Sequence, residues 1–157
     1  DYFKSINDQS SHLVGSYVIA EVGKLVKYSG ILGSSDVAAR YGGDEYIIMT
    51  NDFHINQLTE KTEAIRKLIA NATFMKDGAS YNVTASMGCA WVERGFKGVA
   101  EDLLKAADLM CYSSKTRGRN CTSALLFGNN VDLNSISPSI EKSVAPSKNS
   151  RFKVVNE

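Results

Sequence analysis

The sequence predicts one folded domain that mixes helices and strands, in the order α-α-β-β-α-β-α-β. Three patterns support this prediction. Apolar residues recur every three or four positions between Leu13 and Tyr28, which is typical of a helix with one buried face. Two glycines, Gly42 and Gly43, separate two short apolar runs, as in a β-hairpin. Between residues 81 and 91, large apolar side chains alternate with smaller or polar ones, as in a strand.

Local signals place the individual elements along the chain. The expected helices cover, in chain order, residues 3–8, 13–28, 55–71 and 98–116. The expected strands cover residues 36–41, 44–50, 81–91 and 124–127. Gly30 and Gly118 follow two of the helices as helix-ending residues. Asp77-Gly78 is a candidate turn into the strand that starts at residue 81.

Composition indicates one soluble domain with a tail. The 157 residues are 43% hydrophobic with a net charge of +1, which allows a real core and gives no bulk attraction to nucleic acid or to a membrane. No apolar run approaches the roughly 20 residues that span a bilayer. Cys89, Cys111 and Cys121 lack metal-ligand spacing and indicate reduced thiols in a cytoplasmic protein. We expect the folded domain to cover residues 1–128, and a flexible tail rich in Ser, Asn and Lys to cover residues 129–157.

The most informative segment is residues 40–46, with the sequence Arg-Tyr-Gly-Gly-Asp-Glu-Tyr. Glycines let another molecule approach the backbone closely. Adjacent carboxylates can hold hard cations such as Mg²⁺, which often bind nucleotide phosphates as well. Asp44 and Glu45, directly after Gly42 and Gly43, therefore form a candidate metal and phosphate site. Taken alone, these residues also fit a surface hairpin with two solvated acids.

Five blocks, in order, resemble the GGDEF family of diguanylate cyclases over roughly residues 1–120. Residues 42–46 resemble the GGDEF signature itself, with Tyr46 in the place of the usual Phe. The other blocks are residues 1–8 (Asp-Tyr-Phe-Lys-Ser-Ile-Asn-Asp), residues 11–15 (Ser-His-Leu-Val-Gly), residues 83–88 (Val-Thr-Ala-Ser-Met-Gly) and the segment 107–120, which ends in Gly-Arg-Asn. No single block is specific, but five in the same order are.

The resemblance implies an α+β fold, a sheet flanked by helices that is related to nucleotidyl cyclases and polymerase palm domains. In this family a central strand precedes the first block and ends in a metal-binding Asp. This chain begins two residues past that Asp. We therefore expect the first central strand to be missing from this chain, which would leave strand edges without partners.

The resemblance also implies an activity. Family members are nucleotidyltransferases that condense two purine nucleoside triphosphates into a cyclic dinucleotide and release pyrophosphate, with Mg²⁺ or Mn²⁺ as the cofactor. The implied partners are GTP and ATP as substrates, a second copy of the chain in a homodimer, and an upstream sensor or receiver domain. No nucleic acid and no membrane is implied for this segment, and the implied location is the bacterial cytoplasm.

Two acids and two cations match the centre of the family's site. Asp44 matches a metal ligand, and Glu45 matches a second acid that binds metal or activates the attacking hydroxyl. Lys115 and Arg119 match residues that hold the β- and γ-phosphates. The alternative for these two cations is an ordinary helix end, where positive charge complements the helix dipole.

The remaining matches concern the nucleotide. Asn7 matches a residue that hydrogen-bonds the purine base, with a helix-capping role as its alternative. The other matching residues leave room for phosphates or contact them, and they are Gly42, Gly43, Lys4 and the backbone amides of Tyr2 and Phe3.

The chain departs from the family pattern at Ser16, where the family has an Asp that accepts hydrogen bonds from guanine. A hydroxyl both donates and accepts, so it can face either purine. A subgroup with Ser at this position, the hybrid promiscuous (Hypr) type, makes 3′,3′-cyclic GMP-AMP. The resemblance at Ser16 therefore predicts that product from GTP and ATP, with cyclic di-GMP beside it. The alternatives are a strict diguanylate cyclase that makes cyclic di-GMP, and a degenerate module that binds nucleotide or dimerises without catalysis.

A second departure concerns regulation. Many relatives carry Arg-x-x-Asp just upstream of the signature, where the product binds and inhibits. Here Asp36 is present, but Gly33 stands at the Arg position. Because a guanidinium fork for the product is missing, we expect product inhibition through that site to be weak or absent.

Overall fold

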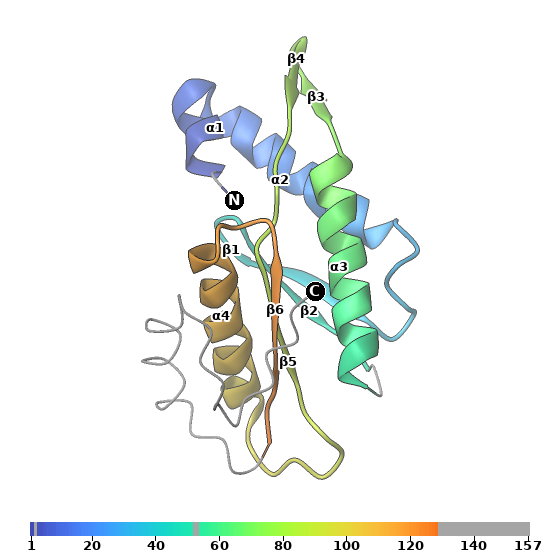
Figure 1. Ribbon diagram of the computed structural model, residues 1–157. Coiled ribbons are helices and arrows are strands. Elements are labelled where there is room, and N and C mark those ends of the chain that lie inside the picture. The colour runs from blue at the N-terminus through green and yellow to red at the C-terminus, as the bar shows by residue number, and fades with distance from the viewer. Residues whose placement is uncertain (2, 52–53, 129–157) are drawn as a thin grey trace.

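A computed structural model describes residues 1, 3–51 and 54–128 of the chain. Helices and short strands follow one another in the order α1-α2-β1-β2-α3-β3-β4-β5-α4-β6 (Figure 1). The helices are α1 (Phe3–Gln9), α2 (His12–Lys27), α3 (Ile55–Asn71) and α4 (Ala100–Thr116). The strands are β1 (Val37–Gly42), β2 (Glu45–Met49), β3 (Phe74–Lys76), β4 (Ala79–Tyr81), β5 (Met87–Trp91) and β6 (Thr122–Leu126).

The four predicted helices are confirmed, because their apolar faces are the faces that pack inward. In α2, the side chains of Val14, Val18 and Val26 are buried at helical spacing. Ser11 caps this helix, and its Oγ accepts a hydrogen bond from the Val14 backbone N–H at 3.3 Å. The predicted tail at residues 129–157 lies outside the described residues.

The strands form three separate two-stranded sheets within the described part of the chain: β1–β2, β3–β4 and β5–β6. The hairpin β1–β2 is antiparallel, as predicted, with Arg40 opposite Tyr46 and an irregularity next to Gly42. Strands β5 and β6 are parallel neighbours, with Cys89 opposite Ala124. Within the described residues, the hairpin β1–β2 is not joined to the β5–β6 pair.

The prediction of one continuous strand over residues 81–91 is wrong. Only residues 87–91 form a strand that pairs with β6, and residues 82–86 lie in no ladder. Residue 81 instead ends a second hairpin, β3–β4, whose turn is Asp77-Gly78 with φ values of 52° and 79°. Alternation indicates which side chains point to one face, but a strand also needs a neighbouring strand for its backbone groups, and residues 82–86 pair with no strand among the described residues.

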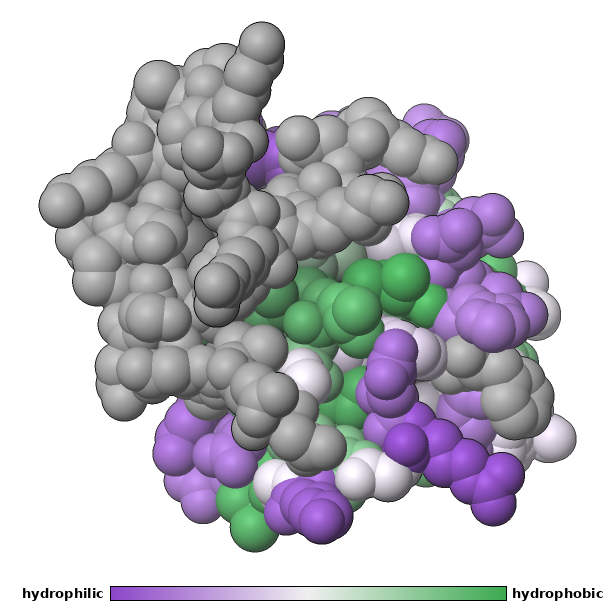
Figure 2. All heavy atoms as spheres, turned by 60° about the horizontal axis from the view of Figure 1, so that its bottom comes forward, coloured by the Kyte–Doolittle hydropathy of each residue, from purple (hydrophilic) through white to green (hydrophobic). Residues whose placement is uncertain are grey.

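The largest buried cluster lies where α4 covers β6. It contains Ala106, Met110, Leu125 and Phe127. The Phe127 ring packs on the ring of Phe96 from the loop before α4, with centroids 5.4 Å apart. Figure 2, which turns the lower end of Figure 1 toward the viewer, shows apolar residues in the middle of this end, beside a border of hydrophilic residues. This cluster fixes α4 against the β5–β6 pair.

Gly88 allows the backbones of β5 and α4 to touch. A Cβ atom at Gly88 would lie 2.1 Å from the Cys111 backbone nitrogen and 2.2 Å from the Ala107 carbonyl oxygen. Both are backbone atoms of α4, so no side chain can move aside to make room. The close approach therefore depends on glycine at this position.

We expect Gly88→Ala to lower the free energy of unfolding by about 3 kcal/mol, because the added methyl group forces β5 away from α4. Gly42→Ala is the matched control, since nothing lies within 4 Å of a Cβ atom there. Urea denaturation of both variants, followed by circular dichroism, measures the difference. Equal stability of the two variants would contradict the packing described.

Candidate functional site

The Gly-Gly-Asp-Glu segment forms the turn between β1 and β2. Gly43 has a φ of +51°, a left-handed conformation that favours glycine. The Arg40 guanidinium closes the turn by donating from Nε and Nη2 to the Gly43 carbonyl, at 2.9 and 2.6 Å. Asp44 and Glu45 follow directly, and both are exposed. The turn therefore presents two adjacent carboxylates to solvent on a fixed backbone.

Tyr46, in the place of the usual Phe of the signature, anchors this hairpin to α2. Its hydroxyl donates a hydrogen bond to the Ile19 carbonyl at 2.7 Å. Gly23 makes room for the ring, because a Cβ atom there would lie 3.0 Å from the Tyr46 hydroxyl oxygen. Burial raises the pKa of Tyr46, so the hydroxyl stays a donor at neutral pH. The substitution thus adds a hydrogen bond to the apolar contact that Phe would make.

The cations at the end of α4 and in the turn after it converge with the acids of the hairpin around Asp1. The charges of Asp44, Lys115 and Arg119 all act at the backbone nitrogen of Asp1. Figure 1 shows the β1–β2 turn beside the C-terminal end of α4 and the N-terminus. Four predicted side chains from two separate blocks, Asp44 and Glu45 of the hairpin and Lys115 and Arg119 near the end of α4, therefore lie in one region of the molecule.

The surroundings of Cys111 also show that the α4 cation Lys115 and the hairpin acid Glu45 lie near each other. Burial raises the pKa of its thiol, and the charges of Lys115, Asp108 and Glu45 act on it from the surroundings. Its thiol donates a hydrogen bond to the Ser86 carbonyl oxygen at 3.5 Å. The raised pKa and the partial burial are typical of a free, reduced thiol that packs against its neighbours.

The carboxylate of Asp1 was not predicted as a site residue, yet it links the parts of the site. It accepts hydrogen bonds from Ser86 Oγ at 2.6 Å, Thr84 Oγ1 at 3.0 Å and the Asn120 backbone N–H at 3.2 Å. Thr84 and Ser86 are two residues apart, so both hydroxyls point to one side of an extended segment. That spacing, present in the block at residues 83–88, is the signal that could have revealed a shared partner.

The turn after α4 carries Arg119 in an unusual backbone conformation. Gly118, Arg119 and Asn120 have successive φ values of 107°, 66° and 47°. The Arg119 backbone N–H returns to the Ser114 carbonyl at 3.0 Å. Lys115 lies in the last turn of α4, and both cationic residues are exposed. The turn therefore places Arg119 just beyond the helix end that carries Lys115.

The predicted base-contacting residues lie apart from these charges, where α1 packs against α2. A Cβ atom at Gly15 would lie 1.9 Å from Asn7 Oδ1 and 2.7 Å from Phe3 Cζ, so Gly15 lets both side chains reach the backbone of α2. Asn7 Oδ1 is buried and has no hydrogen-bond partner among the described residues. Ser16 follows Gly15 and is exposed, as is Lys4 on α1. Tyr2 lies outside the described residues.

Comparison with known proteins identifies the family. A family model described as "Diguanylate cyclase, GGDEF domain" matches residues 1–121. The chain belongs to the GGDEF-domain family of diguanylate cyclases. Members of this family are nucleotidyltransferases, and the α+β cyclase fold expected for the domain is confirmed by its structural neighbours.

Curated relatives and solved structures agree with this assignment. Diguanylate cyclase A of Treponema denticola is 38% identical over 120 residues, which are 76% of this chain and 32% of that protein. The response regulator PleD of Caulobacter vibrioides is 32% identical over 122 residues, 76% of this chain and 26% of that protein. The crystal structure of the GGDEF domain of DgcB from Caulobacter crescentus, in complex with c-di-GMP, has a TM-score of 0.68 at 27% identity, over 79% of this chain and 72% of that one.

The GGDEF domain described here spans about a third or less of the length of these curated relatives. Two of these three relatives, the T. denticola enzyme and DgcB, are connected by name or ligand with cyclic di-GMP chemistry. The comparisons therefore support the alternative of cyclic di-GMP synthesis better than the predicted synthesis of 3′,3′-cyclic GMP-AMP. None of the helices in residues 1, 3–51 and 54–128 has the length and apolar character that a bilayer crossing requires.

The donor set of the GGDEF hairpin fits a hard divalent cation that is shared with a nucleotide. No three acidic, His or Cys side chains gather as a metal site within the described residues. Mg²⁺ is commonly held by one or two carboxylates together with substrate phosphates and water, rather than by a cage of protein ligands. Asp44, with Glu45 beside it, offers that number of carboxylates next to two phosphate-binding candidates.

Asp36 is already engaged within the domain. Its Oδ2 accepts hydrogen bonds from Lys61 Nζ at 2.7 Å and from the Gly33 backbone N–H at 2.9 Å. Its side chain is 3% exposed. The hydrogen bond from Lys61 holds the pKa of the carboxyl below its usual value, so Asp36 is ionised and paired at neutral pH.

Proposed function

We propose that this GGDEF domain condenses two molecules of GTP into cyclic di-GMP. The observation that carries the proposal is the convergence of the hairpin acids, Asp44 and Glu45, with two cations around Asp1. These cations are Lys115, at the end of α4, and Arg119, in the turn after it. Acids and cations side by side suit a metal-bound triphosphate, which carries both a cation and excess negative charge. Membership in the diguanylate cyclase family supports the same substrate class.

The cations would hold the β- and γ-phosphates. Lys115 supplies a compact charge from the helix end, and Arg119 supplies a fork of donors that suits phosphate oxygens. Because both residues belong to α4 or to the turn after it, they move together with the helix. Gly42 and Gly43 would leave room for the phosphates, since nothing lies within 4 Å of a Cβ atom at either position.

The acids would act where the attacking hydroxyl meets the α-phosphate. Asp44 would hold Mg²⁺ or Mn²⁺ together with phosphate oxygens, and Glu45 would share the metal or accept the proton of the attacking hydroxyl. When bound, the cation neutralises phosphate charge and lowers the pKa of a nearby hydroxyl. In each step a bond forms between a 3′-oxygen and the α-phosphorus, the bond from that phosphorus to the β-phosphate oxygen breaks, and pyrophosphate leaves.

The product requires two such steps in opposite directions. Each nucleotide is attacked once and attacks once, so two sites that each hold one nucleotide must face each other. A homodimer of this domain supplies them with a single kind of site. The proposal therefore includes a homodimer for catalysis, with regulation from other parts of the full-length protein.

A second candidate product is 3′,3′-cyclic GMP-AMP, and Ser16 is the observation that favours it. Ser16 is exposed on α2, directly after the glycine that contacts Asn7. A hydroxyl at this position tolerates both purines, whereas a carboxylate selects guanine by accepting its two donors. This candidate uses the same phosphate site and differs only in the choice of base.

Product control through the Arg-x-x-Asp site is proposed to be absent. Gly33 offers no guanidinium, and Asp36 is nearly buried and bound to Lys61 at 2.7 Å. A product molecule would have to displace that ion pair before it could reach the carboxylate. Both halves of the inhibitory site are therefore lost, one by substitution and one by internal pairing.

We expect Asp44→Ala and Glu45→Ala each to lower the rate of cyclic dinucleotide formation by about a hundredfold or more, because each removes charge stabilisation or proton transfer at the reacting phosphate. Thermal unfolding of both variants should match the wild type, since both side chains are exposed. Glu60→Ala, an exposed acid on α3, is the matched control. Pyrophosphate release from GTP with Mg²⁺, by the protein produced from its complete gene, measures the rate. Full turnover in well-folded Asp44→Ala and Glu45→Ala would refute the site, and no release by the wild type would favour the degenerate module.

Base choice is tested with equimolar GTP and ATP, with products separated by chromatography. If Ser16 sets the second candidate product, the wild type makes cyclic GMP-AMP beside cyclic di-GMP. Ser16→Asp then shifts output toward cyclic di-GMP by about tenfold, because a charged and selective contact replaces a tolerant one. Ala20→Asp adds the same charge to an exposed position one turn further along α2 and should leave the product ratio unchanged. A wild type that makes only cyclic di-GMP excludes the second candidate.

We expect added cyclic di-GMP to leave the initial rate of the wild type unchanged. The double variant Gly33→Arg with Lys61→Met should acquire inhibition, because it supplies the guanidinium and releases the Asp36 carboxylate. Gly33→Arg alone is the matched control and should stay insensitive while Lys61 holds Asp36. Steady-state rates with and without added product measure the effect. Strong inhibition of the wild type would show that the product binds elsewhere or displaces Lys61.

A further inference from the structure

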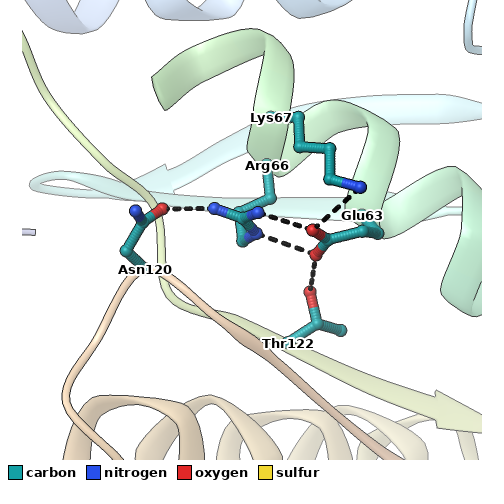
Figure 3. Close-up of polar contacts among 5 residues, drawn as sticks. All are labelled: Glu63, Arg66, Lys67, Asn120 and Thr122. Atoms are coloured by element: carbon teal, nitrogen blue, oxygen red, sulfur yellow. Dashed lines mark hydrogen bonds and ion pairs between the residues drawn. The ribbon is translucent and has the colours of Figure 1, made fainter. Parts of the chain in front are cut away.

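A polar cluster connects α3 to the turn that carries Arg119 (Figure 3). The Arg66 guanidinium lies at its centre and forms a two-pronged ion pair with Glu63, through Nε at 2.8 Å and Nη2 at 2.5 Å. Its remaining terminal nitrogen, Nη1, donates to Asn120 Oδ1 at 2.6 Å. The Arg66 side chain is only 14% exposed, so these bonds form largely out of water.

Glu63 holds this guanidinium in place. The Arg66 hydrogen bonds keep the pKa of Glu63 below its usual value, so the carboxylate is charged at neutral pH. Thr122 Oγ1, at the start of β6, adds a longer contact to Glu63 Oε2 at 3.4 Å. Lys67 also reaches Glu63, at 3.6 Å, but its side chain is 65% exposed. Arg66 thus has a fixed orientation, because Nε and Nη2 donate to Glu63 while Nη1 donates to Asn120.

Asn120 is held from two sides. Its side chain accepts from Arg66, and its backbone N–H donates to Asp1 Oδ2 at 3.2 Å. The residue before it is Arg119, and both residues have left-handed backbone conformations. Asn tolerates such a conformation, whereas Arg disfavours it, so the turn needs bonds from outside to keep its shape.

We propose that Arg66 is a positioning residue for the phosphate-binding turn: by holding Asn120, it fixes where Arg119 presents its guanidinium to the β- and γ-phosphates. The inference rests on the proposed function, because it takes Arg119 as a phosphate ligand. Arg66 itself touches no part of the nucleotide in this proposal. It acts through the Asn120 amide and the backbone bond between residues 119 and 120.

The competing explanation is that the cluster only stabilises the packing of α3 on β6. Lys67 offers a matched control, because it contacts the same Glu63 carboxylate from the same helix but has no hydrogen bond to the turn among those described. Asn120→Gly is the partner variant, since glycine keeps the left-handed φ of 47° while it removes the amide. Asn120→Asp retains an acceptor for Arg66 and a tolerated backbone conformation.

The experiment measures the affinity of the protein, produced from its complete gene, for two probes in the presence of Mg²⁺. One probe is a GTP analogue with a methylene group between the α- and β-phosphorus atoms, which cannot release pyrophosphate, and the other is GMP. Only the first has the phosphates that Arg119 would hold. The ratio of the two affinities therefore reports on the phosphate-binding turn, whereas a loss of stability alone leaves this ratio unchanged.

We expect Arg66→Ala and Asn120→Gly each to lower the preference for the triphosphate analogue over GMP by about tenfold, the size of one charge-assisted hydrogen bond. The double variant should lose no more than either single variant, because Arg66 acts through Asn120. Lys67→Ala should keep the wild-type preference, and Asn120→Asp should retain most of it. If Arg66→Ala does not fold, Asn120→Gly alone decides the question.

The outcomes separate this inference from the function on which it rests. A wild type that prefers the triphosphate analogue, with the same preference in Arg66→Ala and Asn120→Gly, overturns the positioning role and leaves the proposed function standing. An equal loss in Lys67→Ala also overturns it, since the effect then follows from Glu63 and not from the turn. A wild type without any preference for the triphosphate overturns both.

Discussion

The contact between the backbones of β5 and α4 at Gly88 is the constraint on which the site depends. A side chain at this position would collide with backbone atoms of α4 at 2.1 and 2.2 Å, so the helix and the strand approach as closely as main chains can. On α4, one helical turn after Cys111, which lies at the Gly88 contact, the fully buried Ser114 hydroxyl donates to the Met87 carbonyl at 2.7 Å. These contacts fix the C-terminal end of α4, and with it Lys115 and the turn of Arg119, beside the Asp1 carboxylate.

The site places positive charge where the helix itself offers none. The C-terminal end of a helix carries partial negative charge, which favours cations but opposes a phosphate. Lys115 lies within the last turn and is stabilised there without any ligand. Arg119 lies beyond the helix end, in a turn held by Arg66 and Asp1 through Asn120. In the proposed site, a cation beyond the helix end would attract phosphate against the dipole, and its left-handed backbone would have to be maintained by outside bonds.

The sequence predicted the elements whose signals are local. Helices α2, α3 and α4 have apolar faces with a clear period, and Gly42-Gly43 marks the hairpin without reference to the rest of the fold. The continuous strand over residues 81–91 failed because pairing depends on a neighbour that alternation cannot report. Strand β3 was missed because three residues are too short for a pattern.

The site shows the same division between local and long-range information. The Gly-Gly-Asp-Glu turn and the cations after residue 114 were found from motifs, and the structure brings them together. Asp1 and Arg66 were missed as linking residues, since their partners lie 119 and 54 positions away along the chain. On α3, Glu63 and Arg66 have the spacing of an ordinary surface pair, and nothing in the helix alone indicates that Arg66 also reaches Asn120.

The residues proposed for phosphate binding and those proposed for base recognition lie on different elements of this fold, and this bears on how the product would be chosen. The charged residues gather between the β1–β2 turn and the end of α4, whereas Asn7 and Ser16 lie where α1 meets α2. The buried Asn7 oxygen has no partner within the described residues, so a donor from a ligand or solvent would relieve its desolvation. An amide oxygen accepts from guanine or from adenine alike, so Asn7 alone gives little selectivity. If the domain makes only cyclic di-GMP, guanine selection needs a contact other than Asn7 and the Ser16 hydroxyl, because Ser16 stands where the family resemblance implies a guanine-selecting Asp.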